Sequence, residues 1–529
     1  MYDIIFKNAH IVDGTGAPWY KGDLAVKDGR IAAIGKIAGG AARVVECNSH
    51  VLAPGFIDTH AHYESIINLV PGTEANLMQG VTTQVCGVCG LSPAPISDAV
   101  EDDVKQYVGF AAAGLKLDWP WRSFGEYFNK IDSLPLGVNF SAYVGHGTLR
   151  ILAMGFVDKK PSDEELRRMK SLLREAMEAG ALGMSTGLFY PPGVWGDVDE
   201  LGELGKVLAE YGGVFACHMR NEADQIVASV EEVLEVGRRS GCKLQVHHHK
   251  VGGVKNWGLV NETLAMMEKA RREEGLDVML DQYPYTFSAT TLRAILPPWA
   301  QVGGVQATIE RLKDEDVRAR IMDDIGTGLP NWENQYVQVP GAEAVLLFYT
   351  PYTPQFQGLN LAQAAKIHGK DPVSTALDII MLNNGSDLAG YGSMSEEDVK
   401  TVMRSPLTMV GSDTIPGSAT VKCHPRAFGT FARVLGKYVR EEKVLTLEEA
   451  VRKMTSLPAA RFGFAGKGVL HVGMDADLVL FNSETVRDVA DFVDSARYPE
   501  GIDMVVVGGR IAVEGGKETG IRAGKLLRN

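Results

Sequence analysis

The chain has 529 residues, with 53 lysines and arginines against 66 aspartates and glutamates, which gives a net charge of −13. An acidic balance disfavours binding to phosphate backbones, so we expect no nucleic-acid partner. Six cysteines in so long a chain are not a disulfide framework, and no stretch approaches the roughly 20 apolar residues of a membrane span. The first residues carry Asp3 and Lys7 within their apolar stretch and so lack the core of a signal peptide. We therefore expect a soluble, cytoplasmic protein with no membrane partner.

The two ends of the chain read as short strands separated by turns. Leu24–Lys27 and Ile31–Ile34 flank Asp28-Gly29, which is a strong hairpin signal, and Leu478–Phe481 and Met504–Val507 are similar segments near the C-terminus. We predict that residues 1–54 and 466–529 pair into one small β-sandwich and that residues 55–465 form a separate catalytic domain.

The central segment alternates short apolar runs with longer amphipathic stretches. Ser162 and Glu165 form a capping-box pattern that opens one of these stretches. Repeated β-then-α units indicate a parallel sheet, and eight of them predict a closed (β/α)8 barrel. An open, doubly wound sheet is the alternative, although it usually has a glycine-rich loop after its first strand. The predicted strands are Phe56–His62, Thr82–Cys89, Val138–Val144, Leu182–Thr186, Val214–His218, Lys243–His248, Val278–Asp281 and Leu407–Gly411.

The last two predicted strands lie far apart in the sequence. The intervening segment is longer than a single returning helix needs, so residues 286–404 contain an insertion, which we place at about 286–350. A long segment over the C-terminal face of a barrel is typical of a lid or a substrate wall.

The first barrel strand ends in His60-Ala61-His62. Residues i and i+2 of a strand point to the same face, so both imidazoles project together at the end of the barrel where active sites lie. Paired imidazoles suit zinc, although two incidental histidines would give the same pattern. Four further predicted strands end in residues that can bind metals, namely Cys86 and Cys89, His218, His247–His249 and Asp413. This agreement between strands favours a metal centre.

The pair Cys86 and Cys89 has three interpretations. A zinc ribbon would need a second such pair, which the sequence lacks, and a redox pair would usually open a helix. The third is that one thiolate binds the metal, which is chemically sound for zinc. Cys47, Cys86, Cys217, Cys242 and Cys423 are expected to be ordinary buried thiols.

Recognisable segments occur along nearly the whole chain and include PGFIDTHAH, GVTTQVCGVCGLSPAP, GALGMSTGLFYPPG, CHMRNEAD, HHHKV, DQYPYT and GVLHVGMDADLVLF. Together these segments resemble the amidohydrolase superfamily and, within it, the N-acyl-D-amino-acid deacylase (D-aminoacylase) family. Some members of that family use a cysteine where other amidohydrolases use a carboxylated lysine on the fourth strand, and Ala181–Gly187 here has no lysine. The resemblance implies a tight zinc site of Cys89, His218 and His248 and a second, weaker site of His60, His62 and Asp413. His247 departs from the serine usual at its position.

The resemblance also implies roles for other residues. Asp413 stands where the superfamily keeps its catalytic aspartate, which would take a proton from the attacking water and return it to the leaving amine. Lys250 and Arg426 match residues that hold the substrate α-carboxylate, although each could be a surface or capping cation. Tyr190 and Tyr283 look like pocket-lining phenols, and a core tyrosine is an equally good interpretation of either.

Three further groups are assigned by hypothesis. Arg293 either faces the substrate side chain, which would favour an acidic D-residue, or forms a surface salt bridge in the insertion. We expect His146 to lie behind the site. Arg220 and Glu222 are expected to form a structural ion pair.

The resulting hypothesis is zinc-dependent hydrolysis of N-acyl-D-amino acids, or of peptides that end in a D-residue. The alternatives are a cyclic amide hydrolase of the hydantoinase or dihydropyrimidinase type, which usually carries the carboxylated lysine, and a non-enzymatic hydantoinase-like scaffold. Intact metal-binding residues argue against the scaffold.

Overall fold

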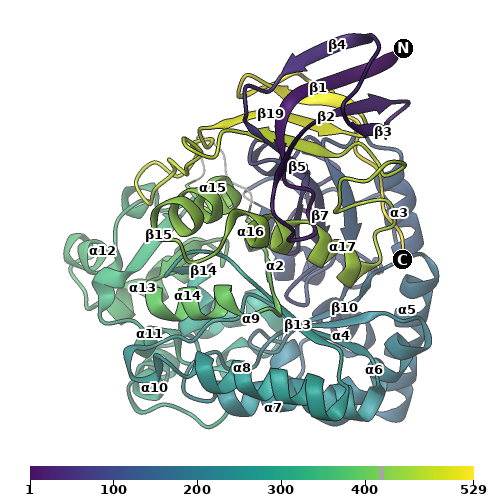
Figure 1. The fold of residues 1–529 in the computed structure, drawn as a ribbon. Coiled ribbons are helices and arrows are strands. Elements are labelled where there is room, and N and C mark those ends of the chain that lie inside the picture. Colours follow the sequence, from purple (N-terminus) through teal and green to yellow (C-terminus); the bar gives the residue numbers. More distant parts are fainter. Residues whose placement is uncertain (113, 416–421) are drawn as a thin grey trace.

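A computed structural model describes residues 1–112, 114–415 and 422–529. In Figure 1 a β-rich domain that contains the N-terminus lies at the top, a barrel surrounded by helices lies below it, and a further group of helices lies at the left. The (β/α)8 barrel with a β-sandwich, predicted from the sequence, is therefore confirmed.

All eight predicted barrel strands are present, one of them divided in two. Six segments form one parallel sheet and three form another, and β8 and β9 follow one another directly in the chain. The ring closes where Ala61 pairs in parallel with Thr414 and the Thr59 amide donates to the Val410 carbonyl. The strands are Phe56–Asp58 (β6), Val81–Cys86 (β7), Asn139–Ala142 (β8), Val144–Gly145 (β9), Gly183–Gly187 (β10), Val214–His218 (β11), Lys243–Val246 (β12), Val278–Gln282 (β13) and Thr408–Val410 (β17).

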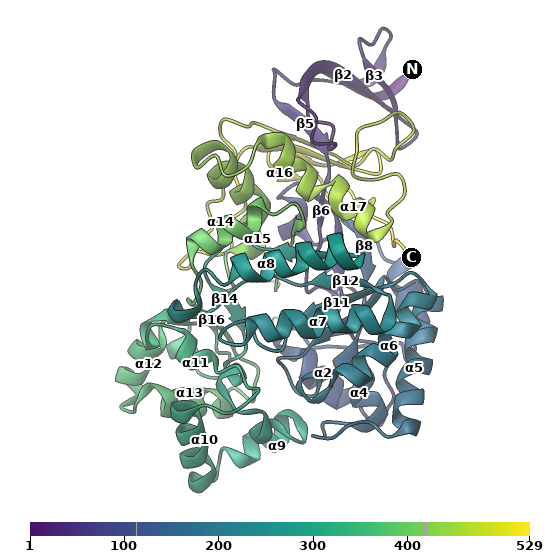
Figure 2. The ribbon, with the colours of Figure 1, turned by 60° about the horizontal axis from the view of Figure 1, so that its bottom comes forward.

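Amphipathic helices cover the barrel, and α5 to α8 run across its outer surface in Figure 2. The capping box predicted at Ser162 and Glu165 is present at the start of α5, and the helix buries Met169, Leu173 and Met177. The helices are Glu74–Leu77 (α1), Glu101–Val108 (α2), Phe124–Asp132 (α3), His146–Met154 (α4), Asp163–Glu178 (α5), Val198–Glu210 (α6), Ile226–Ser240 (α7), Val260–Lys269 (α8), Glu396–Arg404 (α14), Arg426–Arg433 (α15), Leu447–Met454 (α16) and Ser456–Phe462 (α17).

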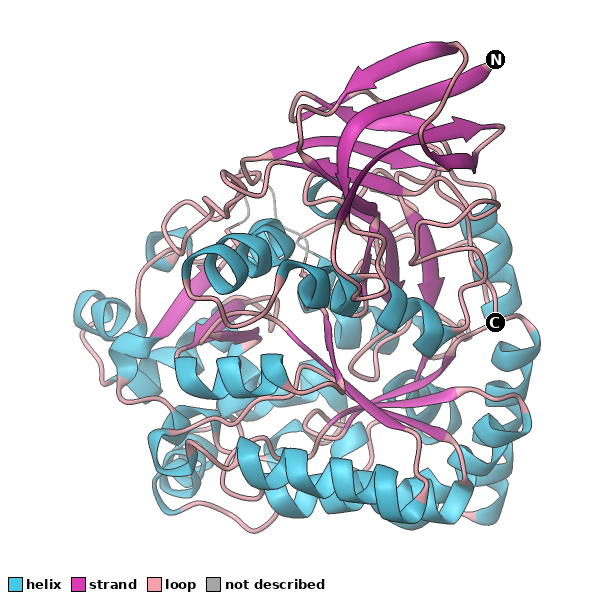
Figure 3. Cartoon of the chain, viewed as in Figure 1, coloured by secondary structure: helices cyan, strands magenta, loops and turns pink. Residues whose placement is uncertain are grey.

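Strands from both ends of the chain share one sheet of nine strands. The strands of this sheet lie together at the top of Figure 3. Successive side chains of β18 point to opposite faces of the sheet, and both faces are buried. Leu478 and Leu480 enter the core inside the β-domain, while Val479 and Phe481 pack against the barrel helices. The strands are Tyr2–Ile11 (β1), Tyr20–Lys27 (β2), Arg30–Gly35 (β3), Ala41–Glu46 (β4), Val51–Pro54 (β5), Leu478–Phe481 (β18), Ile502–Val507 (β19), Arg510–Glu514 (β20) and Lys517–Glu518 (β21).

A three-stranded antiparallel sheet and five helices lie between β13 and α14. Because β16 returns to pair with both β14 and β15, this unit extends past residue 350 to Tyr391. It has an apolar core of its own, which includes Leu292, Ile295 and Ile325. Its elements are Ser288–Thr290 (β14), Val345–Tyr349 (β15), Leu388–Tyr391 (β16), Gly304–Arg311 (α9), Glu315–Thr327 (α10), Gln335–Gln338 (α11), Leu361–His368 (α12) and Pro372–Leu382 (α13).

The extreme C-terminus leaves the β-domain and runs along the barrel. The Gly524 amide donates to Leu136 and the Leu527 amide to Phe140, next to β8. The domain limits at residues 54 and 466 stay a prediction. Among the helices in the described part of the chain, none combines the length and apolar character that a membrane crossing needs.

Candidate metal centre and active site

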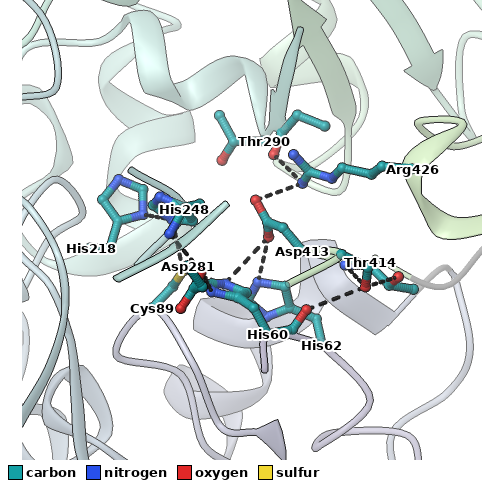
Figure 4. A network of polar contacts seen from close by, with 12 residues as sticks. His60, His62, Cys89, His218, His248, Asp281, Thr290, Asp413, Thr414 and Arg426 are labelled. Atoms are coloured by element: carbon teal, nitrogen blue, oxygen red, sulfur yellow. Dashed lines mark hydrogen bonds and ion pairs between the residues drawn. The ribbon is translucent and has the colours of Figure 1, made fainter. Parts of the chain in front are cut away.

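The six predicted metal ligands meet at the C-terminal end of the barrel (Figure 4). Each follows or ends a different strand except for the two histidines after β6, and none is more than 7% exposed. The residues are His60, His62, Cys89, His218, His248 and Asp413.

The ligand atoms are spaced as a metal centre requires. Cys89 Sγ lies 3.3 Å from His248 Nε2, which is 3.0 Å from His218 Nδ1. Asp413 Oδ1 lies 3.2 Å from His62 Nε2 and 3.5 Å from His60 Nε2, and Cys89 Sγ is 3.4 Å from the same His60 atom. Donor atoms that share one zinc at bond lengths of 2.0–2.3 Å are separated by about 3–4 Å. Sets of three side chains whose donor atoms all lie within 4.8 Å of one another include His60 with Cys89 and His248, and His60 with His62 and Asp413. His218 falls in a set with His248 and Glu222 rather than with Cys89.

Three of these residues have left-handed backbones. Cys89, His248 and Asp413 have φ of 54°, 34° and 51°. A residue with a Cβ atom pays roughly 1–2 kcal/mol for this conformation, and such strain clusters at functional sites. Strand propensity alone would place His248 inside β12, but the strand ends at Val246 and the backbone turns, so that the imidazole faces Cys89.

The protonation states of the predicted histidine ligands differ. Burial holds the pKa of His218 and that of His248 well below the usual value, so both rings are neutral, which is the form that binds metals. Burial acts in the same direction on His60, but the surrounding Cys89, Asp281 and Asp413 outweigh it and raise the His60 pKa to about 10.

Glu222 is a site residue that the sequence analysis missed, and the prediction of an Arg220–Glu222 ion pair is wrong. Arg220 instead pairs with Glu232 at 2.8 Å. Glu222 lies 3.1 Å from His248 Nδ1 and 2.5 Å from Lys250 Nζ. Residues two apart point to the same face only while a strand continues. Because β11 ends at His218, the side chains of Arg220 and Glu222 need not point the same way.

Asp281 and Glu64 were also missed, and both lie behind the predicted ligands. Asp281 Oδ1 lies 3.2 Å from His60 Nδ1 and accepts from the His248 amide at 2.7 Å. Glu64 lies 3.3 Å from His62 Nδ1 and accepts from the Gly87 amide. Carboxylates of this kind orient metal-binding imidazoles. Their positions in the sequence could have revealed them, since Asp281 ends a predicted strand and Glu64 stands two residues after His62.

His146, the first residue of α4, contacts Glu200 at 2.7 Å. It is not among the residues that line the cavity at the predicted ligands. Its expected place behind the site stays a prediction. The five remaining cysteines are buried free thiols, as predicted.

Two cavities that share part of their walls lie at this end of the barrel. The first is lined by Cys89, His218, Lys250, Tyr283 and Asp413 among others. The second is lined by Arg293 and Trp332 among others, and Tyr190 lines both. Tyr190 Oη lies 2.9 Å from Thr290 Oγ1.

The predicted substrate-binding cations differ in their surroundings. Lys250 lines the first cavity and is held by Glu222, which helps to raise the Lys250 pKa against the opposing effect of burial. The hydroxyl of Tyr283 is buried without a partner among the described residues, and the ring lies 4.5 Å from the Arg426 guanidinium carbon. Arg426 itself pairs with Asp413 Oδ2 at 3.0 Å.

Arg293 has no carboxylate within ion-pair distance among residues 1–112, 114–415 and 422–529, so the alternative of a surface salt bridge is wrong for the described chain. Its Nε atom is buried and lacks a hydrogen-bond partner there. The side chain instead lines the second cavity.

The sequence profile of the amidohydrolase family matches residues 43–513. The chain belongs to the amidohydrolase family. Within it, this amidohydrolase is a member of the D-aminoacylase group and an enzyme, as its sequence motifs predicted.

Curated and solved relatives cover the whole amidohydrolase chain. An N-acyl-D-glutamate deacylase of Alcaligenes xylosoxydans xylosoxydans is 37% identical and aligns with 99% of this chain and 96% of its own. A D-aminoacylase of the same organism is 34% identical over 99% and 97%. The crystal structure of N-acyl-D-glutamate deacylase from Bordetella bronchiseptica, in complex with zinc and a phosphonate inhibitor, is 35% identical with a TM-score of 0.85, each chain being fully covered. A D-hydantoinase is 16% identical with a TM-score of 0.55 over 100% of this chain and 99% of its own, which shows a shared fold.

Proposed function

We propose that this amidohydrolase uses zinc to hydrolyse the amide bond of N-acyl-D-amino acids, with a preference for acidic D-residues. The observation that carries this proposal is the arrangement of charges around the two cavities. The proposed ligands are Cys89, His218, His248, His60, His62 and Asp413, and all of them except His60 line the first cavity. Lys250 lines one cavity and Arg293 the other.

We assign the chemistry to Asp413 and its neighbours. Bound zinc would lower the pKa of water toward neutrality and polarise the scissile carbonyl. The Asp413 pKa is held well below its usual value because Arg426 and His60 outweigh the effect of burial, so the carboxylate is ionised at neutral pH. Its Oδ1 atom would take the proton of the attacking water and deliver it to the leaving amine nitrogen, while Arg426 holds Oδ2.

Substrate recognition follows from the cations. Lys250, whose Nζ lies 5.9 Å from the centre of the Tyr283 ring, would bind the α-carboxylate together with the Tyr283 hydroxyl. Arg293 would bind a side-chain carboxylate, to which its planar guanidinium is suited, and Tyr190 would form the wall between the two positions. The preference for acidic D-residues is supported by the similarity to an N-acyl-D-glutamate deacylase, which is 37% identical.

The test is a substrate panel with metal analysis. Chelated protein should lose activity and recover it with zinc, and N-acetyl-D-glutamate should be hydrolysed faster than N-acetyl-D-leucine and N-acetyl-L-glutamate. Arg293→Met should reverse the first preference, whereas Arg320→Met, at an exposed arginine of the same insertion that stacks on Trp299, should not. Equal rates for the glutamate and leucine substrates would contradict the role of Arg293, and activity without metal would contradict the zinc mechanism.

A further inference from the structure

The loop that carries Cys89 needs external support. Gly87, Cys89 and Gly90 all have positive φ, of 70°, 54° and 79°, so three of four consecutive residues are left-handed. The segment lies beyond the end of β7 and has no ladder hydrogen bonds to fix it. Something outside the loop must hold the thiol in position.

Ser185, on the neighbouring strand β10, brackets this loop. Its hydroxyl oxygen accepts from the Gly90 amide at 3.0 Å and donates to the Gly87 carbonyl at 2.5 Å. Both bonds are buried, and the Ser185 side chain has no exposed surface. One hydroxyl therefore joins the residues on either side of Val88 and Cys89.

The backbone of β10 is shaped for the same contact. Gly187 stands two residues after Ser185 and so on the same face of the strand. A Cβ atom at Gly187 would lie 2.3 Å from the Cys89 carbonyl oxygen, which no real side chain could tolerate. The Gly90 carbonyl is held in turn by the Gly147 amide at 3.1 Å.

We propose that Ser185 is a positioning residue for the metal centre: its hydroxyl fixes the Cys89 loop so that the thiolate points at the proposed ligands His60 and His248. The inference rests on the proposed ligand role of Cys89. Strand β10 contributes no ligand to the proposed centre, but under this proposal it holds the loop that carries one. Removing the hydroxyl should leave the loop free to rotate the thiol away, because Gly87 and Gly90 have wide conformational freedom.

The test uses Ser185→Ala, Ser185→Thr and a matched control, Ser141→Ala. Ser141 is an equally buried serine on β8 whose hydroxyl donates to the Leu527 carbonyl, away from the site. Metal-free proteins are titrated with Cd²⁺, and the thiolate-to-metal charge-transfer absorption reports whether Cys89 binds. Alkylation of Cys89 in the metal-free proteins, followed by peptide mass spectrometry, reports the loop without any metal.

Ser185→Ala should bind Cd²⁺ at least ~10-fold more weakly, with a reduced thiolate band and faster alkylation of Cys89. Ser185→Thr keeps the hydroxyl in a residue suited to strands and should retain the band. Ser141→Ala should match wild type in all three measurements. A wild-type protein without the band contradicts the ligand role of Cys89 itself and with it the inference. A band and affinity unchanged in Ser185→Ala, or lost equally in Ser141→Ala, overturn the positioning role alone.

Discussion

Lys250 Nζ lies 2.5 Å from Glu222 Oε2, and the other oxygen of that carboxylate lies 3.1 Å from His248 Nδ1. One buried carboxylate therefore contacts both a proposed metal ligand and the proposed substrate-binding cation. Glu222 is 3% exposed, so these two side chains rather than solvent surround its carboxylate.

Replacing Lys250 by methionine should destabilise the fold as well as impair binding. The variant leaves a buried carboxylate without its cation, a change that typically costs about 3–5 kcal/mol, and kcat/KM for an N-acyl-D-amino acid should fall at least ~10-fold. Unfolding in urea measures the stability. The double variant Lys250→Met/Glu222→Gln should recover much of the stability and none of the activity. Equal stability of the single variant and wild type would show that the pair is not coupled.

Asp413→Asn should lower kcat at least ~100-fold while the protein stays folded, since asparagine cannot accept the proton of the attacking water. The matched control is Asp398→Asn. Asp398 is equally 7% exposed, but its oxygens accept from the Gly258 amide, remote from the cavities. Steady-state rates on N-acetyl-D-glutamate compare the two variants, and near-wild-type turnover of Asp413→Asn would remove its assigned role.

In metal-free protein, Cys89→Gly should be more stable than Cys89→Ala by about 1 kcal/mol. The reason is that Cys89 has φ of 54°, where glycine avoids the steric penalty of a Cβ atom. The order should reverse at Cys217, a buried residue within β11, because glycine weakens a regular strand. Urea unfolding of the four variants gives the comparison. If Cys89→Ala were more stable than Cys89→Gly, the loop would have to relax out of the left-handed region.

Glu333 should make stability fall as the pH rises through neutrality. Burial and the neighbouring Glu222 raise the Glu333 pKa from 4.5 to about 8, so ionising it costs more in the folded protein than in the unfolded chain. The penalty is absent below about 4.5, grows between the two values and is complete above about 8, where it amounts to roughly a few kcal/mol.

The variant Glu333→Gln should therefore equal wild type near pH 4.5 and exceed it in stability near pH 8.5. Its side-chain oxygen can still accept from the Glu222 amide, the contact made at 2.5 Å by the carboxylate. Glu343→Gln, at an exposed position of the same insertion, should follow the wild-type curve. Parallel curves for wild type and Glu333→Gln would contradict the raised pKa.

The barrel was predictable because its signals are local. Each strand is a short apolar run followed by an amphipathic helix, and the capping box at Ser162 is a pattern of adjacent residues. The positions of His60, His62, His218 and Asp413 followed from the rule that parallel strands bring their carboxyl ends together. The full length of the insertion was not predictable, because β14 pairs with a strand about 100 residues later.

The sequence by itself determined the barrel, the β-domain from both termini and the residue types that gather at one rim, because periodicity and strand direction are local properties. Only the tertiary structure decided which partner each charge has. Glu222 faces Lys250 rather than Arg220, Asp281 supports His60, and Ser185 holds the Cys89 loop. In each of these contacts at least one partner lies beyond the end of its strand, where no periodic rule applies, and the distances are set by packing between segments far apart in the sequence.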